Sequence, residues 1–504
     1  MIMEKSKEYL QKEKFFADLD RLHLSLTFDD VRLKTRYYPE DYDPNQAPDL
    51  STHFSKNIKL KLPFVSAAMS TVTESDMAIA MAKEGGLGII HNAMDIDKQK
   101  KELRKVKKYV NSLIEKPIIV QDDWSIEQLL NYCNDKNFNF TTFPVVDQNE
   151  NFVGMLTNNN LKYELDESKQ IKDIFTPLDK VIRTDPKISS EDAFLMMKKH
   201  KTSTLPVIDL NNKVVGLYLW SDLVRIHHEK SNYNVNEKGQ LIVGAAISSG
   251  TDYLERIEEI KNYTDLLVID SADGDSKFVV DALIKVKENY PNIDVVVGNI
   301  SEGESALKLA EIGADGIKVG QGPGSICTTR IETGIGTPQV SAIYNCFSKL
   351  NEKYSSIPIC GDGGIRDKGD ISIAIASGAS SVMMGRVLAG VKESPGKVIS
   401  RPDGSQYKEY YGMGSRKSFD NNPNSKIRYN QTDNQVLIEG VESIIPYQGE
   451  LKTVLNGLVM ALKKSMIYLK TKSIEEHRYN TNFTRITNSG LRESGSHDVN
   501  VIGI

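Results

Sequence analysis

The chain of 504 residues is longer than one ordinary domain, so its length predicts two or three domains, of which one can be a large barrel. A hydrophobic content of 39% and a charged content of 26% are typical of a soluble globular protein, and a net charge of -5 with no strongly basic half argues against nucleic acid as a partner. The four cysteines have neither paired nor metal-ligand spacing, which argues against a disulfide framework and a structural zinc site.

The two ends of the chain show no recognisable targeting signal. Residues 1–20 are charged throughout and lack the apolar segment of a secretory signal peptide. No stretch reaches about 18 consecutive apolar residues, which a transmembrane helix requires. Residues 501–504 are not a peroxisomal signal of the usual type. We therefore expect a cytoplasmic protein without a membrane partner.

A recurring order of helix, glycine and strand organises most of the chain. A helix over residues 74–84 ends at Gly85 and precedes a strand over residues 87–91, and the same order returns around Gly313 and Gly378. With the other apolar runs, candidate strands begin near residues 62, 87, 241, 266, 294, 316, 357 and 381. Eight alternating βα units predict an α/β fold, a closed (β/α)8 TIM barrel rather than an open doubly wound sheet.

The interval between the second and third strands is far too long for one helix, which predicts an insertion between about residues 116 and 236. Within it, the pattern of residues 142–156 recurs at residues 204–218. Each copy of this unit is too small to bury its own apolar face. We therefore expect the two copies to pack on each other as one compact module.

The predicted strand over residues 314–319 leads into a glycine-rich loop that carries a cysteine. Gly320, Gly322 and Gly324 allow a tight turn and a close approach of backbone N–H groups to an anion. Cys327 comes next, followed by two threonines and an arginine. A tight turn around an inert cysteine is the plainer interpretation. Thiolate chemistry, however, needs partial exposure and positive surroundings, which this order of residues favours.

Polar residues and glycines fall where the predicted strands end. In a TIM barrel the active site is built at the carboxyl ends of the strands. The residues at these ends are Asp270, Asn299, Gly320, Asp362 and Gly385.

Two later stretches have little apolar pattern of their own. The stretch from Tyr410 to about residue 434 is rich in Gly, Ser, Asn, Lys and Arg and is too long for an ordinary connection, so we expect a lid or disorder there. The final stretch over residues 471–504 is polar and should lean on another part of the protein.

These motifs resemble those of the IMP dehydrogenase family, in the same order and from about residue 24 onward. The most specific is the cysteine loop at residues 322–330. The others are residues 66–69 with 71–74, 361–364, 411–415 and 439–440. The twin repeat resembles the tandem CBS pair that this family inserts in its barrel.

The resemblance implies a division of the chain into three segments. Residues 1–115 and 237–504 would form the two parts of the catalytic barrel, and residues 116–236 a tandem CBS domain with repeats at about 117–175 and 176–232. The second part of the barrel would include a mobile flap at about residues 410–438 and a tail that contributes to a cation site.

The activity implied by the resemblance is the oxidation of IMP to XMP with NAD+, the committed step of guanine nucleotide synthesis. Cys327 matches the nucleophile that attacks C2 of the hypoxanthine, after which hydride passes to NAD+ and a covalent thioimidate remains. Arg428 and Tyr429 match the pair that hydrolyses this intermediate, with Thr329 as the hydroxyl partner of the same water. An arginine base is unusual because its pKa lies above about 12, so only a specially desolvated site would let it take a proton.

Substrate contacts follow from the same matches. Asp362 matches the carboxylate that accepts hydrogen bonds from the ribose hydroxyls. The residues that match phosphate contacts are Ser325, Gly364, Gly385 and Tyr410, and those that match contacts to the base are Met413, Gly414 and Glu439.

Two cofactors are implied as well. The residues that match NAD contacts are Asp270, Asn299, Gly320 and Gly322. A K+ site matches the backbone carbonyls of Gly322, Gly324 and Cys327, completed by Glu493, Ser494 and Gly495 of a neighbouring subunit in a homotetramer.

The sequence departs from the family pattern in places. Ser70 follows Met69 where many relatives carry aspartate, and we have no interpretation of this change. In the CBS pair, the aspartate that often holds an adenosine ribose is Asp222 in the second repeat, but Asn160 takes the matching position in the first. A purine nucleotide at the CBS domain and a merely structural insertion both stay open.

Two rival functions remain. GMP reductase shares the barrel, the cysteine loop and the thioimidate but uses ammonia and NADPH, and the Arg428–Tyr429 flap together with the CBS insertion favours the dehydrogenase. A non-catalytic nucleotide sensor with an inactive barrel is the other rival. The presence of Cys327, Thr329 and Arg428 argues against it.

Overall fold

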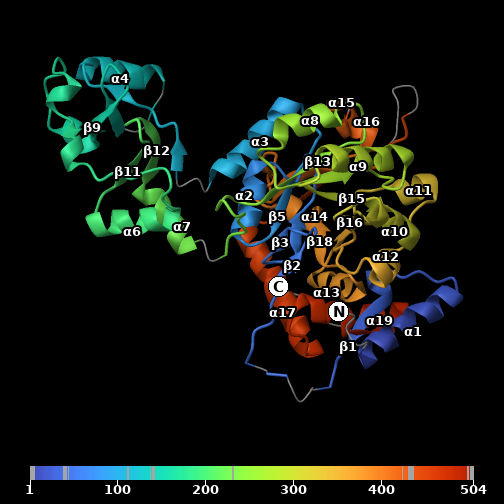
Figure 1. The fold of residues 1–504 in the computed structure, drawn as a ribbon. Helices are drawn as coiled ribbons and strands as arrows, with labels where there is room; N and C mark the ends of the chain where they lie inside the picture. The colour runs from blue at the N-terminus through green and yellow to red at the C-terminus, as the bar shows by residue number, and fades with distance from the viewer. Residues whose placement is uncertain are drawn as a thin grey trace. The chain divides into compact units, whose positions relative to one another are not determined.

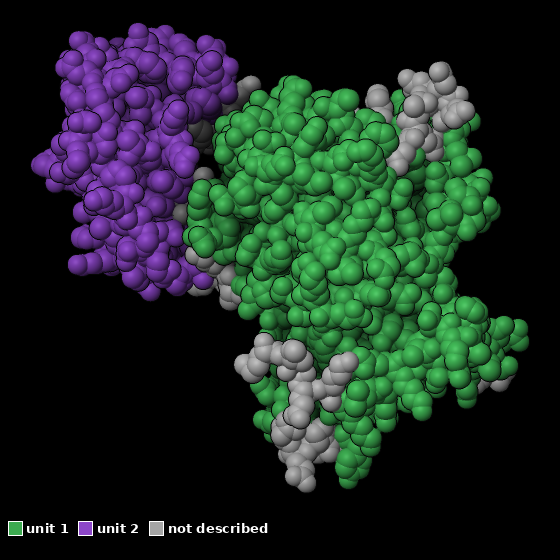
Figure 2. Space-filling view, turned by 45° about the vertical axis from the view of Figure 1, so that its right-hand side comes forward, with its two compact units in different colours: residues 1–109, 232–504 green, residues 110–231 purple. Residues whose placement is uncertain are grey.

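The computed structural model describes residues 6–37, 42–43, 45–109, 113–136, 138, 142–229, 232–422, 424–429, 436–496 and 499. The chain divides into two compact units, shown in different colours in Figure 2. Unit 1 comprises Met1–Tyr109 and Asn232–Ile504, and unit 2 is Val110–Ser231. None of the helices in the described part combines the length and the apolar character needed to cross a lipid bilayer.

The core of unit 1 is a closed barrel of parallel strands in the order β13-β14-β15-β16-β17-β18-β4-β5 (Figure 1). The strands are β4 Phe64–Ser66, β5 Leu87–Ile90, β13 Val243–Ile247, β14 Leu266–Asp270, β15 Asp294–Ile300, β16 Gly316–Val319, β17 Ile359–Asp362 and β18 Ser381–Met384. Nearly every strand residue is buried, because helices cover the outer face of such a barrel and side chains fill its interior. The prediction of a (β/α)8 barrel is confirmed.

Helices surround the barrel (Figure 1). They are α2 Ser75–Lys83, α3 Ile96–Tyr109, α8 Tyr253–Ile260, α9 Lys277–Asn289, α10 Gly303–Glu311, α12 Gln339–Lys353, α13 Lys368–Ser377, α14 Arg386–Ala389 and α17 Leu451–Leu469. In α12 the helical spacing places Val340, Ile343, Phe347 and Leu350 on the buried face. Burial of each such side chain stabilises the fold by about 1.5–3 kcal/mol.

The turn after α13 shows why glycine ends a barrel helix. Gly378 has a φ of 127°. A Cβ at this position would lie 2.3 Å from the ring of Phe347 on α12. Only glycine permits both this backbone conformation and this close approach of α12 to the start of β18.

The two ends of the described chain lie together. Helix α1 (Lys7–Arg21) packs beside β22 (Asn482–Arg485), which pairs antiparallel with β1 (Val31–Lys34). Helices α18 (Ile474–Tyr479) and α19 (Asn488–Glu493) complete this region. The polar carboxyl-terminal stretch therefore leans on the amino-terminal segment, as predicted.

The stretch expected to be a lid or disordered contains secondary structure. After β20 (Gln406–Tyr411) come two short helices, α15 (Arg416–Asn421) and α16 (Asn424–Arg428). The chain then returns through β21 (Glu442–Pro446), which pairs with β20. Residues 423 and 430–435 of the predicted flap lie outside the described residues.

Unit 2 contains two copies of one α/β motif. The first copy comprises β7 Val120–Gln121, α4 Ile126–Asp135, β8 Phe143–Val146, β9 Phe152–Leu156 and α5 Asn158–Lys162. The second comprises α6 Ser190–His200, β11 Thr204–Ile208, β12 Val214–Leu219 and α7 Trp220–Glu229, and β12 also pairs with β6 Leu113–Glu115. A shared cluster of Phe152, Met155, Ile208 and Leu217 joins the copies, so they pack on each other as predicted.

Candidate active site

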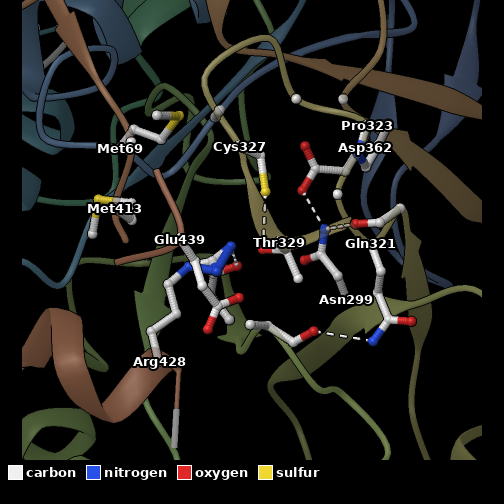
Figure 3. A pocket seen from close by; sticks show the side chains of 18 of the residues that line it. Met69, Asn299, Gln321, Pro323, Cys327, Thr329, Asp362, Met413, Arg428 and Glu439 are labelled. Atoms are coloured by element: carbon white, nitrogen blue, oxygen red, sulfur yellow. Dashed lines mark hydrogen bonds and ion pairs between the residues drawn. The ribbon is translucent and has the colours of Figure 1, made fainter. Parts of the chain in front are cut away.

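A cavity of about 450 Å³ opens at the carboxyl ends of the barrel strands. Asp270 and Asp362 are the last residues of β14 and β17, Asn299 is the penultimate residue of β15, and Cys327 reaches the cavity from the loop after β16 (Figure 3). Arg428 enters from α16. This is the location that the barrel fold predicts for an active site.

The cysteine loop leaves β16 through a glycine that no other residue could replace. Gly320 has a φ of 145°. A Cβ there would lie 2.0 Å from the backbone oxygen of Asp362, so β16 and β17 end in direct backbone contact. Asn299 donates a hydrogen bond of 2.7 Å to the Gly320 carbonyl, which ties a third strand end to the same point.

The thiol of Cys327 lies beside a hydroxyl. Its Sγ is 3.1 Å from Oγ1 of Thr329, the first residue of the short helix α11 (Thr329–Thr333). Met69 and Met413 lie on one side of Cys327 in Figure 3, and Asp362 lies on the other. The thiol thus faces a cavity that has an apolar wall for a flat ring and a carboxylate for a polar group.

Backbone pairing holds the cysteine loop against the segment that follows the predicted flap. Thr328 donates its N–H to the Glu439 carbonyl at 3.0 Å, and Val441 donates its N–H to the Ile326 carbonyl at 3.0 Å. Cys327 and Gly440 form an antiparallel bridge. The position of the thiol therefore depends on both segments.

Arg330 braces the loop. Its Nε donates to the Gln321 carbonyl at 3.0 Å and its Nη2 donates to the Thr337 carbonyl at 2.6 Å. Burial lowers the pKa of Arg330, while its interaction with Cys327 raises it. The arginine that the sequence placed near the thiol thus has a structural contact as well as an electrostatic one.

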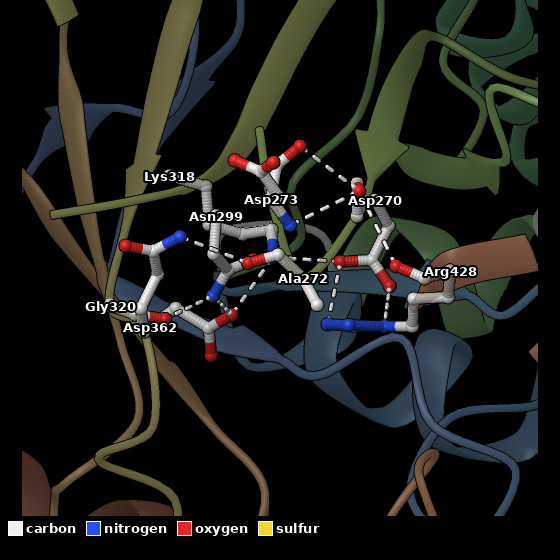
Figure 4. Close-up of polar contacts among 10 residues, drawn as sticks. Asp270, Ala272, Asp273, Asn299, Lys318, Gly320, Asp362 and Arg428 are labelled. Atoms are coloured by element: carbon white, nitrogen blue, oxygen red, sulfur yellow. Dashed lines mark hydrogen bonds and ion pairs between the residues drawn. The ribbon is translucent and has the colours of Figure 1, made fainter. Parts of the chain in front are cut away.

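A buried network of charges connects the strand ends (Figure 4). The ammonium of Lys318 donates to Oδ1 of Asp270 at 2.8 Å, to Oδ2 of Asp362 at 2.9 Å and to Oδ1 of Asn299. Asn299 in turn donates from Nδ2 to Oδ2 of Asp362 at 2.9 Å. Arg428 grips Asp270 at two points, with Nε 2.8 Å from Oδ2 and Nη2 3.1 Å from Oδ1.

The protonation states of this network follow from its charges. Burial alone would raise the pKa of Asp270, but Arg428 and Lys318 outweigh it and lower the pKa. Burial lowers the pKa of Arg428 and of Lys318, but the nearby acidic groups, with Asp270 the strongest of them, together outweigh burial and raise each pKa. Asp270 is therefore a carboxylate between two cations, and Arg428 keeps its proton in this arrangement.

The end of the flap helix is docked on β14. Ala272 donates its N–H to the Arg428 carbonyl at 2.9 Å. The ring of Tyr429 packs so closely on Gly414 that a Cβ there would lie 2.8 Å from Cζ. Burial raises the pKa of Tyr429. Both residues that matched the hydrolytic pair thus line the cavity.

Two of the residues that matched phosphate contacts, Ser325 and Gly385, lie beside the hydroxyl of a third, Tyr410. Tyr410 is hydrogen-bonded to Ser325, and burial raises the Tyr410 pKa more than this bond lowers it. A Cβ on Gly385 would lie 2.8 Å from the Tyr410 hydroxyl. Gly364 lies close to Pro323 of the cysteine loop. These loops therefore meet, although Ser325, Gly364 and Gly385 do not line the cavity itself.

Most of the candidate residues come together in the cavity. Those that line it are Asp270, Asn299, Gly320, Gly322, Gly324, Cys327, Thr329, Asp362, Tyr410, Met413, Arg428, Tyr429 and Glu439. Glu493, Ser494 and Gly495 lie instead at the exposed end of α19, which packs near the 3-10 turn at Phe28–Asp30. Within one chain the structure does not bring these three residues to the cysteine loop.

Sequence reasoning missed Lys318. Its signal was a lysine inside an apolar strand, between Ile317 and Val319, where a buried cation needs partners. It also missed the pairing of Arg428 with Asp270, because these residues are far apart in the chain.

No group of three or more His, Cys, Asp or Glu side chains that could hold a metal ion occurs among the described residues. A monovalent cation held by carbonyl oxygens is a different kind of site. The Gly324 carbonyl accepts a hydrogen bond of 3.1 Å from the Cys327 N–H, which leaves its second lone pair for a ligand. The loop residues are thus compatible with part of a K+ site.

In unit 2 the two matching ribose positions differ. Asn160 accepts a hydrogen bond from the Thr157 N–H and donates one to the Ile174 carbonyl, so its amide is engaged by its own repeat. Asp222 lies in the first turn of α7.

A closed (β/α)8 barrel with a thiol, buried carboxylates and docked cations at the carboxyl end of its strands has the architecture of a TIM-barrel enzyme. Residues 25–497 match the family described as the IMP dehydrogenase / GMP reductase domain. The chain belongs to this family.

Named relatives with similar sequences are dehydrogenases. The inosine-5'-monophosphate dehydrogenase of Aquifex aeolicus is 40% identical over 480 residues, covering 94% of this chain and 96% of the relative. That of Helicobacter pylori (strain ATCC 700392 / 26695) is 41% identical over 488 residues, covering 95% and 98%.

A similar solved structure is a reductase. The complex of a cysteine-to-alanine variant of GMP reductase from Trypanosoma brucei with guanosine 5'-monophosphate has a TM-score of 0.83 and 35% identity. The match covers 95% of this chain and 98% of the reductase chain. The part of this chain that the reductase does not match is much shorter than unit 2, residues 110–231. The reductase therefore also matches most of unit 2. The insertion therefore does not favour dehydrogenase over reductase, and that part of the sequence argument was wrong.

Proposed function

We propose that the protein oxidises IMP to XMP with NAD+ and water, through a covalent intermediate on Cys327. The observation that carries this proposal is the Cys327–Thr329 contact of 3.1 Å at the wall of a cavity that Asp270 and Asp362 also line. The identity of about 40% with named dehydrogenases over nearly the whole chain supports it. The chemistry needs a nucleophile that adds to C2 of the purine and later leaves, which suits a thiolate.

The substrate would lie across the barrel mouth. Asp362 accepts hydrogen bonds from the ribose hydroxyls, and Ser325, Gly385 and Tyr410 hold the phosphate where the later barrel loops meet. Met413, with Gly414 and Glu439, contacts the base. Addition of the Cys327 sulfur places a hydride-donating carbon in the cavity.

The cavity residues also fit a nicotinamide cofactor. Asp270, Asn299, Gly320 and Gly322 all line the cavity. When bound, NAD+ accepts the hydride from C2. Asp270 and Asn299 would hold the cofactor near the thiol-bound purine, and the closed flap excludes it from Asp270 because Arg428 occupies both carboxylate oxygens.

Hydrolysis of the intermediate involves the flap. While Arg428 contacts Asp270, the carboxylate keeps the proton on the guanidinium, so Arg428 donates hydrogen bonds and accepts no proton. The base role that the resemblance implies therefore belongs to an arrangement in which Asp270 has released Arg428. Thr329 and Tyr429 remain beside the thiol-bound carbon to position the water.

K+ would order the cysteine loop through the carbonyls of Gly322, Gly324 and Cys327, with Glu493, Ser494 and Gly495 of a neighbouring subunit completing the site in a homotetramer. Removal of K+ should slow turnover, and K+ should restore it where Li+ does not. A CBS ligand of the purine nucleotide class and a cytoplasmic location complete the proposal.

GMP reductase is the second candidate, favoured by the similarity to the Trypanosoma brucei reductase. One assay separates the two. The dehydrogenase produces NADH from IMP and NAD+, with a first burst that reports adduct formation, whereas the reductase consumes NADPH with GMP. A purine adduct on Cys327, detected by mass spectrometry, would exclude a non-catalytic sensor.

A further inference from the structure

We propose that Lys318 is a positioning residue that holds one oxygen of Asp270 and one of Asp362, and thereby orients both carboxylates toward their ligands. The inference rests on the proposed function for the identity of those ligands. Lys318 lies on β16, whereas the two carboxylates end β14 and β17. One ammonium therefore joins three strands at the mouth of the barrel (Figure 4).

The contacts divide each carboxylate into a held and an available oxygen. At Asp362, Oδ2 accepts from Lys318 and from Asn299, while Oδ1 has no hydrogen-bond partner within the described part of the chain. Oδ1 is therefore free to accept from a sugar hydroxyl. The carboxylate cannot rotate without losing both bonds at Oδ2.

Asp270 has the same arrangement of one held and one available oxygen when Arg428 of the flap is not bound to it. Lys318 donates to Oδ1, and Nε of Arg428 donates to Oδ2. When Arg428 departs, Lys318 still fixes Oδ1 and leaves Oδ2 for an incoming group. The same lysine thus prepares the sites of both proposed substrates.

Packing alone does not require a charge at this position. Lys318 is 1% exposed and stands between two apolar residues of a buried strand. Apolar side chains of similar volume can often replace a whole buried ion pair without loss of stability, whereas removing one partner alone leaves the other charge unpaired. The charge is explained by the carboxylates it orients.

The titratable and charged groups that face the ammonium come from three elements. They are Asp270 on β14, Asp362 and Cys360 on β17, and Arg428 on α16. Without Lys318, two carboxylates would share the space with only Arg428 to balance them. The pair of carboxylates would then take up a proton more readily. As the pH falls, nucleotide binding would be lost at a higher pH than in the wild-type protein.

The test compares Lys318→Met with Lys318→Arg and with a matched control. Lys107 is also buried and pairs with Asp265, which lies at the other end of β14, away from the cavity. Lys107→Met therefore also breaks a buried lysine–aspartate pair of the barrel. The full-length variants are titrated with IMP and with GMP by calorimetry between pH 5 and 8, and their melting temperatures are measured.

For Lys318→Met we expect about 10- to 100-fold weaker nucleotide binding, the usual worth of a hydrogen bond to a charged group. The acid limb of nucleotide binding, which is the fall in affinity at low pH, should shift to higher pH by about one unit or more. Lys318→Arg keeps the charge and should leave the acid limb in place. Lys107→Met should lower the melting temperature and leave both binding properties unchanged.

The proposal fails if Lys318→Met lowers only the melting temperature, as the control does. Lys318→Arg provides a second test if Lys318→Met does not fold. Arginine keeps the positive charge, so a shift of about one pH unit in the acid limb of nucleotide binding by Lys318→Arg would contradict the proposal. Binding of either nucleotide monophosphate reports on Lys318 whichever reaction the enzyme performs. Absence of IMP oxidation by the wild-type protein would thus contradict the proposed function and would leave the test of Lys318 unaffected.

Discussion

Arg428 and Asp270 form a two-point ion pair that joins the flap helix α16 to the end of barrel strand β14. The guanidinium side chain is only 15% exposed and the carboxylate 3%. The contact places the flap over the part of the cavity assigned to the cofactor. Asp270 therefore cannot contact Arg428 and the proposed cofactor at the same time.

Arg428→Ala should separate the two halves of the reaction. We expect the first burst of NADH to persist, because Cys327 and Asp362 are untouched, while steady-state turnover falls roughly 10²- to 10⁴-fold, the usual worth of a general base. Stopped-flow absorbance resolves burst and turnover. Arg416→Ala, which changes an exposed arginine of the same flap, is the control and should keep both rates. Loss of the burst in Arg428→Ala would contradict a role in hydrolysis.

Gly320→Ala should displace Asp362. The new Cβ would lie 2.0 Å from the Asp362 backbone oxygen, so the end of β17 or the loop must shift. A misplacement of about 1 Å can cost about 10²-fold in rate, and we expect kcat/KM to fall by at least that factor. Gly369→Ala on α13 adds a Cβ that meets nothing within 4 Å and should keep kcat/KM. Equal kinetics for the two variants would show that the close contact at Gly320 is relieved without effect.

Alkylation should distinguish the thiols of unit 1. Burial raises the pKa of Cys360 to about 12 and raises the pKa of Cys346 as well, so both should stay unreactive near neutral pH. Cys327 lines the cavity and should be alkylated first, with IMP slowing the reaction. Peptide mass spectrometry after brief treatment with iodoacetamide measures each site. Preferential labelling of Cys360 in the folded protein would be incompatible with the structure.

Mild acid should destabilise unit 1 through His477. Its ring is buried between Ser372 and Thr471, and burial lowers its pKa to about 4. Between about 6.5 and 4 the unfolded chain binds the proton and the folded chain does not, so the free energy of unfolding falls as the pH drops, by roughly 3 kcal/mol over the whole window. His477→Gln should reduce this dependence, and a part should remain because burial also lowers the pKa of His91.

The measurement is the melting temperature of unit 1 between pH 7 and 4.5. His53→Gln, at an exposed position, serves as the control and should retain the wild-type slope. Identical slopes for His477→Gln and the wild-type protein would place the acid sensitivity elsewhere.

The barrel was predictable because each strand and each helix carries its own local pattern. Gly85, Gly313 and Gly378 mark helix ends in the sequence, and the strands between them are short apolar runs. The order of the strands around the barrel follows from right-handed βα units. These features need no knowledge of distant contacts.

The charge network was not predictable in the same way. Asp270, Lys318 and Arg428 lie on elements that are remote in the chain, and only closure of the barrel and docking of the flap bring them together. The flap helices were missed for a related reason. Helices as short as α15 and α16 are marginal alone, and the packing of Phe419 on Tyr429 supports them.

The flap is held at two backbone points, Arg428 on Ala272 and Glu439 on Thr328. Tethering of this kind sets an effective concentration, which for a short connection is in the millimolar range or above. The guanidinium thus competes for Asp270 as an intramolecular ligand whose occupancy does not depend on dilution. Guanidinium ion added to Arg428→Ala must reach at least that concentration to take its place, so the rescue curve would give the effective concentration directly.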